Sequence, residues 1–376
     1  MASTPWPKRS SKSTRGPRVV GVDPGTVSFD VCALDGGEVL LDDTFRSPDL
    51  ALDPTPLVDA LLAHGPLDLV LGPAGYGLPL VPGERVGDRE VALMLLRRSD
   101  QAGARAGIGG MRAMSRALIG AGLPLMFGPG AIHLPTVPQY RKWNRIDLGT
   151  ADKVCSAALC IVDQAGRLGL TYEETSFIML ELGGAFSAAL AIDRGQIVDG
   201  VGGSSAPIGS RSCGALDAEV AYQLGAALTK ETVFSGGALD PRGELDLSAP
   251  GAIEALRADP GRREGWLALE EGAVKAALAL TASVSAPREI LVAGRLAGAP
   301  GLLDSLAERL AGVATVSTAT GLGASAKTAA HGAAVLADGL AGGRYAPLVE
   351  RLRLREASGT ALDHLRMHGA DSISLA

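Results

Sequence analysis

The chain has few aromatic residues, few cysteines and no excess of positive charge, and each shortage excludes a class of protein. Phe, Trp and Tyr make up 4% of the 376 residues, too few for the stacking platforms that bind single-stranded nucleic acid. The net charge of −6 also argues against nucleic acid as a partner, because such binders need a concentrated basic face. The four cysteines form no C-x-x-C pair and have no histidine at zinc-ligand spacing. We expect Cys32 and Cys155, which lie in apolar patterns, to be buried thiols.

The chain also lacks a long hydrophobic run. No stretch approaches the roughly 20 apolar residues that cross a bilayer, so we expect no membrane as a partner. The first residues, "MASTPWPKRSSKSTRGPR", are basic and rich in Ser and Pro, and they have no apolar core of a secretory signal. We interpret residues 1–17 as a disordered basic tail and expect a cytoplasmic protein.

The chain contains one supersecondary unit written twice. Residues 22–41, "VDPGTVSFDVCALDGGEVLL", align without a gap with residues 180–199, "LELGGAFSAALAIDRGQIVD". The matched positions are Asp23 and Glu181, Gly25 and Gly183, Ala33 and Ala191, Asp35 and Asp193, and Gly37 and Gly195. Each copy reads as two strands joined by a tight glycine turn, with an acid and a second glycine turn at its mouth.

The glycine turns at the two mouths suggest an anion-binding site. Successive backbone N–H groups in such a turn form an anion nest, and glycine lets the backbone approach a phosphate closely. In the first copy, Asp23 would hold Mg²⁺ through water while the turn of Gly25 and Thr26 faces a phosphate, with Thr26 and Ser28 adding hydroxyl donors. One turn from each half would then clamp a polyphosphate from opposite sides. The alternative is that both turns serve only the hairpins of a repeated core.

Two helices rich in small residues are predicted outside the repeats. From Thr150, a plausible N-cap, apolar residues recur at helical spacing through Ala165. The second helix, "ASAKTAAHGAAVLADGLAGG" (324–343), consists almost entirely of small residues. Because small residues let two backbones approach closely, we expect these two helices to pack against each other. The alternative is an ordinary Ala-rich core helix.

The order of these motifs resembles the acetate and sugar kinase, Hsc70 and actin superfamily. Its phosphate-1, connect-1, phosphate-2, adenosine and connect-2 elements look like residues 19–40, 149–165, 177–199, 289–301 and 324–343. More narrowly, "NRIDLGTADK", "LELGGAFSAALAIDRGQIVDGVGG" and "AAHGAAVLADGLAGG" resemble a family labelled predicted butyrate kinase. The resemblance implies an α/β fold with two actin-like (ribonuclease H-like) domains around a nucleotide cleft. The expected division is residues 18–147 and 148–343 for the two domains, and 344–376 for a C-terminal helix and tail.

This chain departs from the usual motifs at three places. Acetate and butyrate kinases carry Asn where this chain has Asp23, and a His-containing phosphate-2 motif where it has Glu181-Leu182-Gly183-Gly184. The Thr that usually follows the phosphate-2 glycines is Ala185 here. The adenosine motif reads Ala293-Gly294-Arg295 in place of two adjacent glycines. The nucleotide-contacting residues implied by the resemblance are Asp23, Gly25, Thr26, Ser28, Glu181, Gly183, Gly184, Gly294 and Arg295.

The acceptor side is predicted from the segment around residue 150. By resemblance to a G-x-D-R/K acid of some pantothenate kinases, Asp152 is a candidate general base beside Lys153; an acid favoured by the helix dipole is the alternative. A carboxylate acceptor would need no base and would be held by arginines, for which Arg141 and Arg145 are the candidates. Ser204 is a further candidate lining residue.

The sequence thus predicts an ATP- and Mg²⁺-dependent kinase that phosphorylates a small carboxylate or hydroxylated metabolite. The alternative is a nucleotide-dependent ATPase switch or assembly subunit with no small acceptor. A homodimer is left open.

Overall fold

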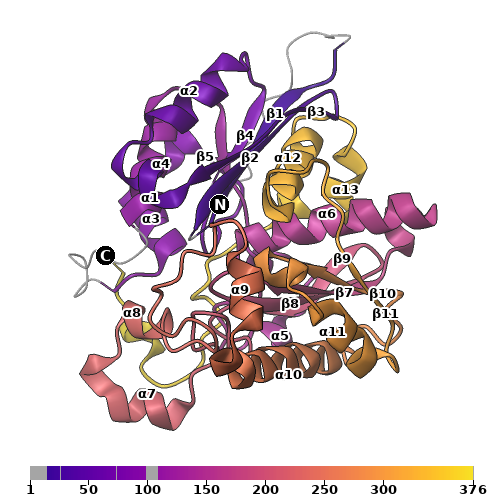
Figure 1. Ribbon diagram of the computed structural model, residues 1–376. Coiled ribbons are helices and arrows are strands. Elements are labelled where there is room, and N and C mark those ends of the chain that lie inside the picture. Colours follow the sequence, from indigo (N-terminus) through magenta and orange to yellow (C-terminus); the bar gives the residue numbers. More distant parts are fainter. Residues whose placement is uncertain (1–14, 26, 73, 99–108, 376) are drawn as a thin grey trace.

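The computed structural model describes residues 15–25, 27–72, 74–98 and 109–375. Two mixed sheets stack with helices between them and on both outer sides (Figure 1). In the described residues the first sheet has the order β3-β2-β1-β4-β6-β5 and the second the order β11-β10-β7-β8-β9. Each sheet therefore contains an antiparallel β-meander that is extended on one side by two parallel strands.

The strands follow closely from the sequence pattern. The first sheet is made of β1 (Arg18–Pro24), β2 (Ser28–Asp35), β3 (Glu38–Arg46), β4 (Leu69–Gly72), β5 (Val81–Pro82) and β6 (Leu125–Phe127). The second is made of β7 (Phe177–Leu182), β8 (Ser187–Asp193), β9 (Gln196–Val201), β10 (Glu289–Ala293) and β11 (Thr315–Thr318). The central strands are buried on both faces, which explains their nearly continuous apolar runs.

The predicted duplication is confirmed down to the irregularities of the two hairpins. The register of β2 on β3 shifts between Ala33 and Leu34, and that of β8 on β9 shifts between Ala191 and Ile192, the aligned positions. The hairpin turns match as well: Gly36 (φ 63°) and Arg194 (φ 49°) are aligned, and both are left-handed. Turns with positive φ suit the twist of a two-residue hairpin, so the copies keep one geometry even where glycine has been replaced.

Helices complete the layers on the outer faces. The first sheet is covered by α1 (Ser47–Leu52), α2 (Thr55–Ala63), α3 (Asp88–Leu95) and α4 (Gly109–Gly120), and the second by α10 (Arg263–Leu280) and α11 (Leu302–Leu310). The excursion between β9 and α10 carries α7 (Ala218–Leu224), α8 (Lys230–Val233) and α9 (Ala252–Ala258). The short α5 (Gln139–Lys142) precedes the central helices. No helix in the described residues is long and apolar enough to cross a membrane.

The central layer consists of α6 (Ala151–Leu168) and α12 (Thr328–Leu340), the two small-residue helices. A Cβ added at Gly332 of α12 would lie 1.8 Å from the Cys155 carbonyl oxygen of α6. On its other side α12 lies on β1, where a Cβ added at Gly21 would lie 2.2 Å from the Ala334 nitrogen. The predicted contact between the two helices is confirmed. It also explains the composition of α12, because only small residues fit between a helix and a strand at this separation.

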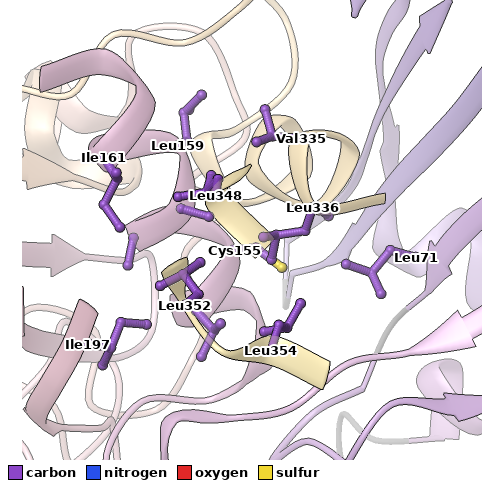
Figure 2. Packing of buried hydrophobic residues seen from close by; sticks show 14 of the residues in the cluster. Leu71, Cys155, Leu159, Ile161, Ile197, Val335, Leu336, Leu348, Leu352 and Leu354 are labelled. Carbon is purple, nitrogen blue, oxygen red and sulfur yellow. The ribbon is translucent and has the colours of Figure 1, made fainter. Parts of the chain in front are cut away.

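The largest buried cluster joins the two halves. Residues of α6 and α12 pack there with both sheets and with the C-terminal α13 (Ala346–Arg351), as Figure 2 shows for Leu159, Val335 and Leu348. Cys155 is part of this cluster, and Cys32 is buried in it too, as expected for structural thiols. Since α12 follows the second sheet in the chain but packs on the first, the halves share one core.

Candidate active site

A cleft of about 1370 Å³ lies between the two sheets. It is lined by the mouths of both duplicated hairpins, by the start of α6, and by Lys327, which immediately precedes α12. The predicted residues that line it are Asp23, Gly25, Asp152, Lys153, Glu181, Gly183, Gly184, Gly294 and Arg295. Thr26, predicted to face a phosphate, lies outside the described residues.

The two glycine turns at the cleft have the same hydrogen bond. The Gly25 N–H donates to the Ser28 carbonyl and the Gly183 N–H to the Phe186 carbonyl, each over 2.9 Å. A Cβ at Gly25 or Gly183 would lie 2.6 Å or 2.9 Å from those same oxygens. Closure of the turn therefore requires both glycines, whatever they bind. Gly184 differs, since a Cβ there would come no nearer than 3.5 Å to another atom, so the turn itself leaves room for a side chain.

Each sheet provides an acid to the cleft, and each acid faces a lysine at the start of the central helix that follows the other sheet in the chain. Asp23, at the end of β1, has Lys327 Nζ 3.8 Å away. Glu181, near the end of β7, accepts a hydrogen bond from Lys153 Nζ over 2.7 Å. Lys153 lies in the first turn of α6, the helix that follows the first sheet. Lys327 immediately precedes α12, the helix that follows the second sheet. Two crossed acid–lysine pairs therefore lie around one cavity, with the acids at matching positions of the two copies.

The first pair is dominated by burial. Desolvation raises the pKa of Asp23 to about 7, although the Lys327 ammonium acts in the opposite direction. Lys327 Nζ is closer to a second acid, Asp30, at 2.7 Å. Asp30 also accepts hydrogen bonds from the Ser28 and Thr44 hydroxyls, each over 2.8 Å. Asp30 therefore holds the lysine, and the Asp23 carboxyl is left to face the cleft.

In the second pair, one ammonium is shared by two acids. Lys153 Nζ lies 2.5 Å from Asp152 Oδ2 and 2.7 Å from Glu181 Oε1. Burial opposes the charge on Lys153, but the two carboxylates outweigh it and raise the pKa of the lysine. Burial likewise opposes ionisation of Asp152, yet Lys153 lowers the pKa of this acid below its ordinary value. The remaining Asp152 oxygen accepts the Thr150 hydroxyl, so Thr150 binds this acid and does not cap the helix with its side chain.

The adenosine-like motif connects the halves. A Cβ at Gly294 (φ 91°) would lie 2.6 Å from the Leu182 carbonyl oxygen, so this position needs glycine. The next residue, Arg295, donates to the Ser28 hydroxyl oxygen over 3.0 Å and to the Leu247 carbonyl over 3.2 Å. Ser28 in turn donates its proton to Asp30. The hydroxyl of Ser28 is therefore engaged within the protein and is not a free phosphate donor, contrary to the sequence-based expectation.

The predicted acceptor arginines do not lie at the cleft. Arg141 Nη1 donates to the Val198 carbonyl over 2.8 Å, and its Nε lies 3.5 Å from Asp199, both on β9. Arg145 is exposed on the loop that follows α5 and is not part of the cleft wall. Ser204 lies behind the wall, with its N–H 3.4 Å from Asp147 Oδ2. Closeness in sequence to Asp152 was misleading here, because the Arg141 side chain is held by β9 and that of Arg145 is exposed.

Several cleft residues were not predicted as site residues. They are Tyr76, Asp147, Arg211 and Lys327, which line the cleft, and Asp30 and Lys230, which bind Lys327 and Tyr76 from behind its wall. For Asp30 and Lys327 the sequence did contain a signal, namely a single charge inside an apolar strand and one just before an apolar helix. Arg211 lines the cleft, while its Nε is packed against Gly243 and has no hydrogen-bond partner among the described residues.

The acids of the cleft suit magnesium bound largely through water. Within the described residues no three His, Cys, Asp or Glu side chains converge closely enough to cage a metal. Mg²⁺ usually keeps several waters and takes only one or two carboxylates together with substrate phosphates. Asp23 faces the cavity, and Glu181 Oε2 is buried without a partner in the part of the chain that the structure describes. These two carboxyls are the residues that would hold such an ion.

The fold is that of acetate and propionate kinases. The structure is similar to that of a propionate kinase from Francisella tularensis, with a TM-score of 0.56 and 11% identity over 84% of this chain and 98% of the other. An acetate kinase from Porphyromonas gingivalis gives 0.54 and 15%, over 81% and 96% of the two chains. At these identities the likeness concerns the fold alone. No curated protein sequence matches the chain. Residues 21–367 match the model of a family described as "Protein of unknown function (DUF1464)", and the chain therefore belongs to this family.

Proposed function

We propose that this protein is an ATP- and Mg²⁺-dependent phosphotransferase that acts on a small-molecule acceptor. The observation that carries the proposal is the crossed arrangement of Asp23 with Lys327 and Glu181 with Lys153 around one cleft. Phosphoryl transfer needs cations to neutralise charge on the phosphates and acids to hold the hydrated metal. A structural ion pair needs neither the cavity nor the repetition from both halves.

The chain's own groups divide this work. The turns after Gly25 and Gly183 present backbone to the cavity from opposite sides, and Gly184 leaves space for a phosphate to approach. The backbone of Arg211 is fixed beside the second turn, because its backbone N–H donates to the Ala185 carbonyl over 3.0 Å. As a residue of the cleft wall, Arg211 adds positive charge for an oxyanion at the turn where Ala185 lacks a hydroxyl. When bound, Mg²⁺ would neutralise part of the charge that develops on the transferred group.

The acceptor is the finer part of the proposal. A butyrate-kinase-like reaction on a carboxylate and transfer to a hydroxyl both suit a cleft of this size. A nucleotide-dependent switch without a small acceptor is the second candidate, and Ala185 favours it, since a missing hydroxyl donor slows transfer more than it weakens binding.

Nucleotide binding is tested by thermal unfolding with Mg·ATP. We expect millimolar Mg·ATP to raise the melting temperature, as any ligand of the folded state does. Asp23→Ala should remove most of the magnesium-dependent part of the shift. Gly184→Val should abolish the shift while the unliganded protein melts near the wild-type temperature, because the turn has room at this position.

The matched control is Gly312→Ala, at a position where an added Cβ meets nothing within 4 Å. This variant should keep the full shift. If the wild-type protein shows no shift with Mg·ATP, both the phosphotransferase and the switch are ruled out. If it shifts and hydrolyses ATP slowly, with no acceptor phosphorylated, the switch is favoured.

A further inference from the structure

A group of polar side chains lies at the wall of the cleft formed by Tyr76 and Asp147. Both residues line the cavity, and neither is explained by the nucleotide contacts proposed above. Asp147 comes from the loop that leads into α6, and Tyr76 from the loop after β4. Because Asp147 interacts electrostatically with Asp152 and Lys153 as well as with Tyr76, this group adjoins the acid–lysine pair at the start of α6.

Asp147 is held rigidly in this wall. Its Oδ1 accepts the Gly149 N–H over 3.0 Å, and its backbone carbonyl accepts the Ser205 hydroxyl over 2.6 Å. The carboxyl group rests directly on Gly202, where an added Cβ would lie 1.5 Å from Oδ1. The side chain is 4% exposed, and no cation forms a hydrogen bond or ion pair with it among the described residues. Burial accordingly raises the pKa of Asp147, which makes its carboxylate a stronger proton acceptor than an ordinary aspartate.

Tyr76 supplies a donor beside this acceptor. Lys230 Nζ donates to the Tyr76 hydroxyl oxygen over 3.0 Å and also lies 4.5 Å from the centre of the tyrosine ring. The Tyr76 hydroxyl also forms a side-chain hydrogen bond with Ser204. Since the phenol oxygen accepts from the lysine, its own proton is available to Ser204 or to a bound acceptor. Burial raises the pKa of Tyr76, with Asp147 adding to the effect, so the hydroxyl keeps this proton. Ser204 lies beside both Tyr76 and Asp147.

Asp152, the base expected from the sequence, is less suited to the task. Its oxygens are held by the Lys153 ammonium at 2.5 Å and by the Thr150 hydroxyl. The Asp147 Oδ2, in contrast, has only the Ser204 N–H and hydroxyl as hydrogen-bond partners among the described residues, at 3.4 and 3.5 Å. Its pKa is lowered by Lys153 despite burial, so it is the weaker proton acceptor of the two acids. The geometry separates their roles: Asp152 is paired with Lys153, while Asp147 lines the cavity and forms no ion pair with the described residues, Lys153 and Lys230 acting on it only at longer range.

We infer that Tyr76 and Asp147 form the acceptor site, and that this site takes a hydroxyl group whose proton passes to Asp147 during transfer. The inference rests on the phosphotransferase function proposed above. The acceptor oxygen forms a bond to the γ-phosphorus of ATP, and the bond between that phosphorus and the β,γ-bridging oxygen breaks. The products are a phosphate monoester and ADP, with the hydroxyl proton on Asp147. Tyr76 binds the acceptor oxygen before transfer.

A hydroxyl fits this pair better than a carboxylate does. A hydroxyl both donates and accepts hydrogen bonds, and the site offers one acceptor, Asp147, and one donor, Tyr76. A carboxylate only accepts, and it would meet the Asp147 carboxyl at close range in a buried setting. An aspartate at this place therefore selects for hydroxyl acceptors and against simple carboxylic acids.

The test is a transfer assay with γ-labelled ATP and Mg²⁺ against two pooled sets of acceptors. One set holds short hydroxy acids and polyols, and the other holds short-chain carboxylic acids with hydroxylamine to trap acyl phosphates. We expect phosphate esters from the first set only. Asp147→Asn keeps an oxygen for the Gly149 N–H and should lower kcat with the best hydroxyl acceptor by roughly 10²–10⁴-fold, with the Mg·ATP melting shift unchanged. Tyr76→Phe should raise KM for that acceptor roughly tenfold with a smaller change in kcat.

Asp199→Asn is the matched control, since Asp199 is a partly buried acid on β9 that bonds Ser283 away from the cleft and should leave transfer unchanged. Acyl phosphate from the carboxylic acids alone, or an Asp147→Asn variant with full activity, would overturn the inference and leave the phosphotransferase function intact. Should Asp147→Asn fail to fold, an unchanged KM in Tyr76→Phe overturns it. A Mg·ATP shift with no transfer to either set overturns the phosphotransferase function itself.

Discussion

Lys153 is the residue whose loss should most disturb the cleft. Its ammonium lies 2.5 Å from Asp152 and 2.7 Å from Glu181, and the lysine and Glu181 side chains are only 12% and 10% exposed. Lys153→Met preserves most of the side-chain volume and removes the charge, so it leaves two carboxylates without their cation. Removing one partner of a buried ion pair costs about 3–5 kcal/mol, because the remaining charge is uncompensated. We expect a loss of free energy of unfolding of this order at pH 8.

The stability loss of Lys153→Met should depend on pH in a definite direction. In the wild-type protein the pKa of Asp152 is lowered, so the acid stabilises the fold above its ordinary pKa and loses that contribution as the pH falls. Without Lys153, burial is left to oppose the charge on Asp152, so this carboxyl is easier to protonate in the folded state than in the unfolded one. Protonation removes the uncompensated charge from the folded variant. The difference in free energy of unfolding between the variant and wild type should therefore shrink as the pH is lowered from 8 to 5.

Urea unfolding followed by tryptophan fluorescence at pH 8 and pH 5 measures both effects. The double variant Lys153→Met, Glu181→Gln tests the cause, since removing one of the two orphaned charges should recover part of the loss. A single variant within about 1 kcal/mol of wild type at pH 8, or a double variant less stable than the single, would refute the electrostatic explanation.

Two further variants test the central layer and the first acid. Gly332→Ala in α12 places a methyl group 1.8 Å from the Cys155 carbonyl oxygen of α6 and should destabilise the protein by about 1–3 kcal/mol or more in urea unfolding. Gly166→Ala in α6, where an added Cβ meets nothing within 4 Å, should stabilise it by up to about 1 kcal/mol. Equal effects would mean that the α6–α12 contact is looser than described. Asp23→Asn should have a larger free energy of unfolding than wild type at pH 8, since burial raises the pKa of Asp23 to about 7 and its charged form opposes folding. This stabilisation should fade as the pH drops through 7 toward 4. A variant no more stable than wild type at pH 8 would contradict the prediction.

Local patterns predicted the hairpins, their duplication and the two small-residue helices, because each depends on neighbours in the sequence. Gly25 and Gly183 are needed by the turn they close, and the matching bulges after Ala33 and Ala191 follow from the same backbone. The helix of small residues was predicted to pack closely, and it does so at Gly332.

Long-range placement was not available from the same patterns. Nothing local indicates that α12 lies on the first sheet, or that Lys327 therefore comes within 2.7 Å of Asp30, almost 300 residues away in the chain. The role given to Arg141 depended on its position beside Asp152 in sequence, but its side chain follows β9. Asp147 carried no signal because an acid in a loop is usually solvated, whereas this one is buried by a loop 55 residues later, at Gly202.

The sharing of α12 between the halves leads to a last prediction about folding. One face of the first sheet, including Val19, Leu34 and Leu71, is buried in the central cluster by α6 and α12, both of which follow residue 147. A fragment of residues 15–147 would expose that face to water and should have no cooperative urea transition. Mixing it with a fragment of residues 148–376 should restore one, since the close contact of Gly21 with α12 forms between the two pieces. Circular dichroism of each fragment and of the mixture measures this. A cooperative transition in the first fragment alone would show that the outer core of α1, α2 and α4 is sufficient to fold the first sheet. The packing of α6 and α12 would then not be what makes the first half fold.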